Sequence, residues 1–396
     1  MSLDLPVYAA NRPPFVVTPY AYQPLEHSQV RLLTLYPGEE LDEIRIRLRH
    51  VKLPPGDSGI NASSEIGDLN LPEYEALSYT WRALVGTDEG GGNNGNRQFI
   101  LSITDNLAEA MRRILHNAGT AKTLWVDALC INQADKAEKS IQVPLMTVGL
   151  PRSCLAGSER DDSALAMRLI GFTGSRVEVD RSSYSYTGFD ADYLAGFEAE
   201  FSMGFSDSAF AASVESLLER EWFKRVWVRQ EVFLARQAVS FCGMSEMGWV
   251  DFRKGALVLA FEFFGMQKAI TLMYLVGTFP IDWLEVRDVL KGLECANPRD
   301  SIYGLLALID THDAGLPEVD YSLSTAEVYT ATATHIFRNA DALHMLMACE
   351  LAPDRMVNLP SWVPDWSTNP VLTLPRTRFP LSSSPVGPEE LCACRE

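Results

Sequence analysis

The residue best placed to act as a catalytic acid or base is Glu231, near the end of the segment 221–232. If this segment is helical, Trp227 and Glu231 are four residues apart and lie one turn from each other on the same face. Apolar residues follow Glu231 directly, so we expect its carboxyl group to be partly buried, with a raised pKa. The alternative is a salt bridge from Glu231 to Arg225 or Arg229.

A second polar group follows the hydrophobic run 124–128, which has the composition of a buried strand. Asp127 and Asn132 come just where this strand is expected to end. In open α/β sheets, ligands bind beyond the carboxyl ends of the strands, so these two side chains are weaker site candidates. Alternatively, both form hydrogen bonds with the neighbouring backbone and cap the next helix.

Other catalytic signatures are missing from the sequence. The tract 86–96, GTDEGGGNNGN, lacks the Lys-Ser/Thr of a phosphate-binding loop and carries acidic residues, so we predict a flexible surface loop. The six histidines include no H-E-x-x-H pattern, and the seven cysteines are scattered without a C-x-x-C pair. We therefore predict no metal site and no disulfide framework, and a reducing, cytoplasmic environment.

The elements that would position these residues alternate between strand and helix. This order predicts an α/β sheet with right-handed parallel crossovers. Strands are expected at 30–36, 43–49, 74–81, 99–103, 124–128 and 238–242, and helices at 105–117, 135–146 and 221–235. The chain after residue 158 is mostly helical in pattern, with a loop expected over 174–192.

Length and charge limit the remaining possibilities. The 396 residues include 34 basic and 52 acidic side chains, a net charge of −18, which argues against binding to nucleic acids or anionic membranes. The most apolar stretch is interrupted by charged residues and a proline, so no membrane span is expected. We divide the chain into an N-terminal segment with short strands and a linker (1–70), a central domain (71–243), a helical region (244–367) and a tail that we expect to be disordered (368–396).

Three blocks of the sequence resemble the HET domain, the heterokaryon-incompatibility module of filamentous fungi. They are YEALSYTW at 74–81, LWVDALCINQADKAEKSIQVPLM at 124–146 and REWFKRVWVRQE at 220–231. The resemblance implies a fungal protein that promotes regulated cell death after non-self recognition. It also implies a TIR-like, flavodoxin-like parallel sheet flanked by helices, because HET domains are distantly similar to TIR domains.

Some TIR domains cleave NAD+ with a glutamate in a Trp-x-x-x-Glu pattern, and the spacing of Trp227 and Glu231 matches this pattern. The resemblance therefore implies that Glu231 is the catalytic residue, that Asp127 lies near the same sheet edge, and that NAD+ is a substrate and no cofactor is tightly bound. The implied substrate pocket is lined by Tyr79, Trp81, Asn132 and Trp227.

The sequence departs from the family pattern at two places. Arg82 stands where the family usually has glycine, and 147–157 does not follow the usual strand pattern, so we expect a central strand to be shortened or replaced. Two alternatives to an enzyme follow. One is a signalling module that self-associates or recruits a protein partner, with Trp222, Trp227 and Phe233 in its core or interface. The other is an inactive, divergent paralogue.

Overall fold

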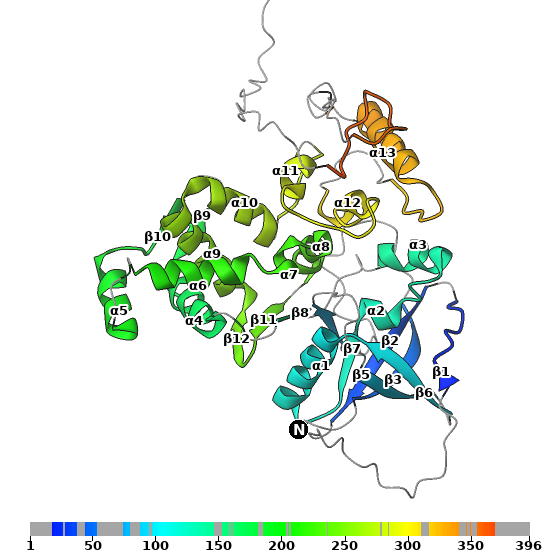
Figure 1. Ribbon diagram of the computed structural model, residues 1–396, viewed down its shortest axis with the longest axis horizontal. Coiled ribbons are helices and arrows are strands. Elements are labelled where there is room, and N and C mark those ends of the chain that lie inside the picture. The colour runs from blue at the N-terminus through cyan, green and yellow to red at the C-terminus, as the bar shows by residue number, and fades with distance from the viewer. Residues whose placement is uncertain are drawn as a thin grey trace, which may run out of the picture.

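The computed structural model describes most of the chain between residues 18 and 368 (Figure 1). The described residues are 18–26, 28–37, 44–53, 74–79, 88–94, 97–145, 153–157, 160, 162–180, 185–202, 205, 207–235, 237–277, 279–283, 285–309, 317–339, 346, 349 and 355–368. Trp81, Arg82 and the tail from residue 369 onward lie outside them.

Ten strands of the described chain form one mixed sheet, which runs from the lower right to the centre of Figure 1. In sheet order they are β1 (Thr18–Pro19), β6 (Arg97–Ile103), β5 (Asp88–Asn94), β3 (Arg45–Lys52), β2 (Gln29–Tyr36), β7 (Lys122–Trp125), β4 (Glu75–Ser78), β8 (Ser153–Gly157), β11 (Ala238–Cys242) and β12 (Ser245–Gly248). The neighbours β7, β4, β8 and β11 are parallel to one another. Antiparallel pairing of β2 with β7 joins the N-terminal segment to this parallel part, so the sheet crosses the expected boundary at residue 70.

The helices lie around the sheet and extend beyond its β12 edge. They are α1 (Asp105–Ala118), α2 (Asp127–Cys130), α3 (Lys136–Leu145), α4 (Ser163–Gly174), α5 (Ala191–Phe201), α6 (Ser208–Leu218), α7 (Glu221–Lys224), α8 (Val226–Leu234), α9 (Trp249–Phe264), α10 (Met266–Val276), α11 (Val286–Leu290), α12 (Asp300–Tyr303), η2 (Leu306–Leu308) and α13 (Thr325–Asn339). In Figure 1, α4, α6 and α9 lie beside β11 and β12, and α12 lies next to α8. Within the described residues, no helix is both long and apolar enough to span a bilayer.

Two hydrophobic cores stabilise this arrangement. The first lies between the sheet and α1, where Leu33, Met111 and Leu124 are fully buried. The second is mainly helical and extends from Val143 on α3 to Trp366, beyond α13. Its closest helix contact is between α4 and α9, where a Cβ atom on Gly255 would lie 2.0 Å from the carbonyl oxygen of Ile170. Only glycine fits at such a contact.

The α/β class is confirmed, as are most of the elements expected in the N-terminal half. In β3, Ile46 and Leu48 are buried and Arg45 and Arg47 are exposed, as their alternation predicts. Thr104 caps α1, because its hydroxyl accepts a hydrogen bond from the backbone N–H of Leu107 (3.3 Å). The helical character of the chain beyond β12 is also confirmed.

Three expectations about local structure are wrong. The tract 86–96 is not wholly a loop, because β5 pairs antiparallel with β6 along seven residues. The segment 174–192 includes a hairpin of β9 (Glu178–Asp180) and β10 (Ser185–Thr187). The helix expected at 221–235 is broken at Arg225, whose backbone is extended (φ −76°, ψ 129°). In the first two cases backbone pairing within a hairpin decides the structure, and in the third case pairing with the distant Glu294 does. The side-chain pattern carries little of that information.

The central part of the sheet is continuous despite the unusual sequence at 147–157. Ser153–Gly157 forms β8, which pairs in parallel with β4 on one side and with β11 on the other. The expectation of a shortened or replaced strand therefore does not hold for these five residues. Residues 147–152 lie outside the described chain.

Candidate functional site

Glu231 lies on α8 where the two hydrophobic cores meet. Only 7% of the residue is exposed, and the hydroxyl of Ser78, at the end of β4, forms a hydrogen bond with its carboxyl group. Burial raises the pKa of this carboxyl group above its usual value. The nearby charge of Arg225 lowers the pKa and that of Asp127 raises it, but the effect of burial is the largest and the net shift is upward. Its Oε2 atom has no hydrogen-bond partner among the described residues. Glu231 is thus a buried acid with one unoccupied acceptor atom.

Tyr79 and Asp127 approach Glu231 because β4 and β7 are parallel neighbours. Tyr79 follows β4 directly and Asp127 follows β7 after one residue, so both lie beyond the carboxyl ends of adjacent strands. Tyr79 is 3% exposed. Burial raises the pKa of its phenol well above the usual value, and the charges of Asp127 and Glu231 raise it further. The sheet edge therefore brings three titratable groups within electrostatic reach of one another.

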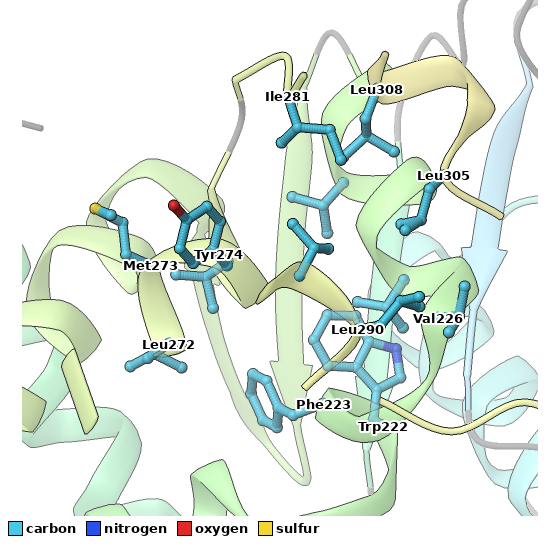
Figure 2. Close-up of a cluster of buried hydrophobic side chains, with 14 of the residues drawn as sticks. Trp222, Phe223, Val226, Leu272, Met273, Tyr274, Ile281, Leu290, Leu305 and Leu308 are labelled. Carbon is cyan, nitrogen blue, oxygen red and sulfur yellow. The ribbon is translucent and has the colours of Figure 1, made fainter. Parts of the chain in front are cut away.

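Helices α7 and α8 are held on this edge by two hydrogen bonds to β4 and the residue after it. The indole Nε1 of Trp222 donates to the Ser78 hydroxyl (2.9 Å), and the Arg225 guanidinium donates to the carbonyl oxygen of Tyr79. Figure 2 shows Trp222 and Phe223 among the buried side chains beneath these helices. Trp222 is therefore a core residue that also contacts the site.

The contacts also bear on the two structural alternatives, a salt bridge of Glu231 to an arginine and local backbone hydrogen bonds of Asp127 and Asn132. Arg229, one suggested salt-bridge partner, donates to the carbonyl oxygen of Gly277 (2.7 Å). Asn132 accepts a hydrogen bond from the backbone of Ala134 (3.3 Å) and its own N–H donates to Glu138 (2.7 Å). Asn132 thus makes the local contacts of a turn residue. Asp127 does so only in part, because its Oδ1 accepts from the next backbone N–H (2.8 Å) while its charge acts on Tyr79 and Glu231.

Trp227, although on the same helix as Glu231, is engaged by the C-terminal region. Its Nε1 donates to Oδ2 of Asp300 (3.2 Å). The structure thus brings together Glu231, Tyr79 and Asp127, and it directs Trp227 and Asn132 to other partners. Ser78 is a neighbour of Glu231 that was not predicted from the sequence, although its place at the end of an apolar strand is a usable signal.

A buried ion pair links the N-terminal strands to the loop beside the site. Arg31 on β2 is fully buried and contacts both carboxylate oxygens of Glu138 on α3, at 2.5 and 3.0 Å. The same guanidinium donates to the carbonyl oxygen of Cys130 at the end of α2 (3.0 Å). Arg31 therefore fixes the chain immediately after Asp127. Arg31 was not predicted as a site residue, although a charged residue inside an apolar strand is a usable signal.

A metal centre is not indicated in the part of the chain that the structure describes. No three His, Cys, Asp or Glu side chains there are grouped so that they could hold a metal ion.

Residues 74–231, which include all of the site residues above, match the family model described as Heterokaryon incompatibility protein (HET). The chain therefore contains a HET domain. It is similar to "Heterokaryon incompatibility protein 6, OR allele" of Neurospora crassa, with 26% identity over a match covering 75% of this chain and 53% of that protein. The chain thus spans about half the length of this curated relative. No solved structure matches it.

Proposed function

We propose that this protein acts in fungal heterokaryon incompatibility, as a HET-domain protein that promotes regulated cell death after non-self recognition. The match of residues 74–231 to the HET family supports the process, as does the likeness to heterokaryon incompatibility protein 6. Cell death requires an effector activity or the recruitment of one. The chemistry of the site favours an activity in the domain itself.

We infer that this activity is TIR-like cleavage of NAD+. By order in the chain, the four parallel strands are arranged 2-1-3-4, as β7-β4-β8-β11. Flavodoxin-like sheets begin with this order and bind ligands beyond the carboxyl ends of their strands. Tyr79 and Asp127 lie at that edge, and Glu231 on α8 is close enough to interact electrostatically with both of them.

The observation that carries the proposal is the buried carboxyl group of Glu231 with its unoccupied Oε2. In NAD+ cleavage the bond between ribose C1′ and the nicotinamide nitrogen breaks, and nicotinamide leaves with the bonding electrons. Water then adds to C1′ and releases a proton, giving ADP-ribose. A carboxylate at this position accepts hydrogen bonds from the ribose hydroxyls and stabilises positive charge at C1′, as carboxylates do in glycosidases.

The alternative of a non-enzymatic signalling module, with Trp222 and Trp227 as anchors, has less support than the enzyme with Glu231 as its catalytic residue. Trp222 is 7% exposed and bonds to Ser78, and Trp227 bonds to Asp300. Both act within the fold, so neither is available as an anchor for a partner. A non-enzymatic module remains the interpretation to adopt if no chemistry is found.

The test is nicotinamide release from NAD+ by the purified full chain, with Glu231→Gln and with Glu198→Gln as a matched control. Glu198 is exposed on α5, away from the site. We expect kcat to fall by about 100- to 1000-fold in Glu231→Gln, the usual loss on removing one electrostatic stabiliser, and to be unchanged in the control. Circular dichroism checks that each variant is folded. Folded wild-type protein that releases no nicotinamide would exclude the NAD+ reaction.

A further inference from the structure

The helix that carries Glu231 is held by the C-terminal region more than by its own ends. Helix α8 has nine residues, and no side chain caps its N-terminus. Its first N–H, of Val226, instead donates to the carbonyl oxygen of Glu294 (3.2 Å), and the N–H of Glu294 donates back to Lys224 (2.5 Å). A segment some 70 residues further along the chain thus supplies the contacts that a helix usually obtains locally.

Asp300, at the start of α12, makes the main side-chain contact with this helix. It is 7% exposed, and each of its carboxylate oxygens has a partner. Oδ2 accepts from Nε1 of Trp227 (3.2 Å), and Oδ1 accepts from the hydroxyl of Tyr321 (2.8 Å). The backbone N–H of Tyr321 in turn donates to the hydroxyl of Ser140 on α3 (2.9 Å). Asp300 therefore connects α8 to the helix that follows the Asp127 loop.

Close packing leaves the first turn of α8 little room to move. A Cβ atom on Gly304 would lie 2.5 Å from Cγ1 of Val226, so the backbone after α12 runs directly against α8. Figure 2 shows Val226 beside Leu290 and Leu305, which come from the same C-terminal region. The apolar contacts hold the helix against the core, while the bond between Asp300 and Trp227 fixes its rotation.

We propose that Asp300 is a positioning residue for Glu231 and acts through Trp227. Trp227 and Glu231 are four residues apart on α8, so a rotation of the first turn displaces the carboxyl group on the next. A displacement of about an ångström at a reacting group can reduce a rate about 100-fold. This inference rests on the proposed function for its kinetic part, but the restraint on α8 can be measured without it.

The experiment compares Asp300→Ala and Trp227→Phe in the full-length chain, each with a matched control. Asp365→Ala controls the first substitution: Asp365 is 6% exposed in the same region, and its oxygens accept hydrogen bonds from Met356 and Ser367 of its own loop. Trp362→Phe controls the second, because Trp362 packs against Phe337 and is 39% exposed. Amide hydrogen exchange of the α8 peptide and the kcat and KM for NAD+ are measured for these four variants, for the double variant Asp300→Ala/Trp227→Phe and for the wild type.

We expect faster exchange across α8 in both test variants and in neither control. We expect kcat to fall by about 10- to 100-fold with KM changed less than about threefold, because binding groups remain while the carboxyl group moves. In kcat the double variant should lose little more than either single variant, since both substitutions break the same hydrogen bond between Trp227 and Asp300. If Asp300→Ala does not fold, Trp227→Phe, which keeps an aromatic ring in place, carries the test.

Two results would overturn the positioning role. One is exchange across α8 at wild-type rates in folded test variants, and the other is an equal loss of kcat in Asp365→Ala. If the wild-type protein releases no nicotinamide, the NAD+ reaction is refuted. If α8 nevertheless exchanges faster in the two test variants and not in the controls, Asp300 is retained as the residue that positions α8.

Discussion

Replacing Glu231 with glutamine is expected to stabilise the protein at neutral pH, although it removes the proposed catalytic group. Burial raises the pKa of this carboxyl group more than Arg225 lowers it. Between the unfolded and the folded pKa the native chain therefore binds more protons than the unfolded chain, so the free energy of unfolding falls as the pH rises through this window. Glutamine does not titrate, and this part of the pH dependence is absent from the variant.

The size of the effect follows from the environment of the carboxyl group. Oε2 is buried without a hydrogen-bond partner among the described residues. Such a group costs about 1–3 kcal/mol of stability, and more when it is charged. Arg225 and the Ser78 hydroxyl offset part of this cost. We therefore expect Glu231→Gln to be more stable than the wild type by about 1–2 kcal/mol at about pH 8. The difference should nearly vanish near pH 4, where the carboxyl group is mostly protonated in the unfolded state as well as in the folded state.

Urea unfolding followed by tryptophan fluorescence, at several pH values from about 4 to 8, measures the difference. Glu327→Gln is a control of opposite sign. Glu327 accepts hydrogen bonds from the backbone and hydroxyl of Ser324, which lower its pKa, so its contribution is present at neutral pH and is lost as the pH falls. Other carboxyl groups with raised pKa values, such as Asp300, are common to both proteins and cancel in the difference. A Glu231→Gln variant that is less stable at neutral pH, or a difference independent of pH, would refute the reasoning.

Three further predictions follow from buried contacts. Arg31→Met should lower the free energy of unfolding in urea by about 3–5 kcal/mol, because Glu138 stays largely buried without its cation. Adding Glu138→Leu to this variant should recover part of the loss, and losses that simply add in the double variant would contradict the prediction. Gly255→Ala should lower stability by about 1–3 kcal/mol in thermal unfolding, since its Cβ would clash with a carbonyl oxygen of α4; Gly248→Ala, with no neighbour within 4 Å, provides the baseline. The kcat for NAD+ should rise with pH through the raised pKa of Glu231, because the carboxylate is the active form; a flat profile between about pH 4 and 8 argues against that role.

Patterns within one element predicted much of the fold and part of the site. The alternation of Ile46 and Leu48 with arginines predicted the strand β3 and its buried face. Ile46 and Leu48 are each 2% exposed. The apolar neighbours of Glu231 predicted its burial and the direction of its pKa shift. The strand order placed Tyr79 and Asp127 at one sheet edge, because the carboxyl ends of parallel neighbours meet there.

Contacts between distant segments could not be predicted in this way. The break at Arg225 depends on pairing with Glu294, and the direction of the Trp227 indole depends on Asp300, 73 residues away. Nothing in the residues around 221–235 specifies these partners, and helix propensity alone favours one uninterrupted helix. The strand β5 was missed for a different reason. Strands are predicted from apolar residues, whereas β5 is rich in Gly and Asn and is held to β6 by backbone hydrogen bonds.

The same distinction applies to the segment in which the chain departs most from the HET pattern. A central parallel strand makes its hydrogen bonds through the backbone to both neighbours, so Ser153–Gly157 can complete the ladder although its sequence departs from the usual pattern. The register of β8 with β11 is maintained along all five residues. Helix α8 leads into β11, so the pairing of β8 with β11 also fixes the position at which the Glu231 helix joins the sheet. The unusual sequence at 153–157 is therefore compatible with an intact site edge, and an interrupted sheet is not a reason to expect an inactive protein.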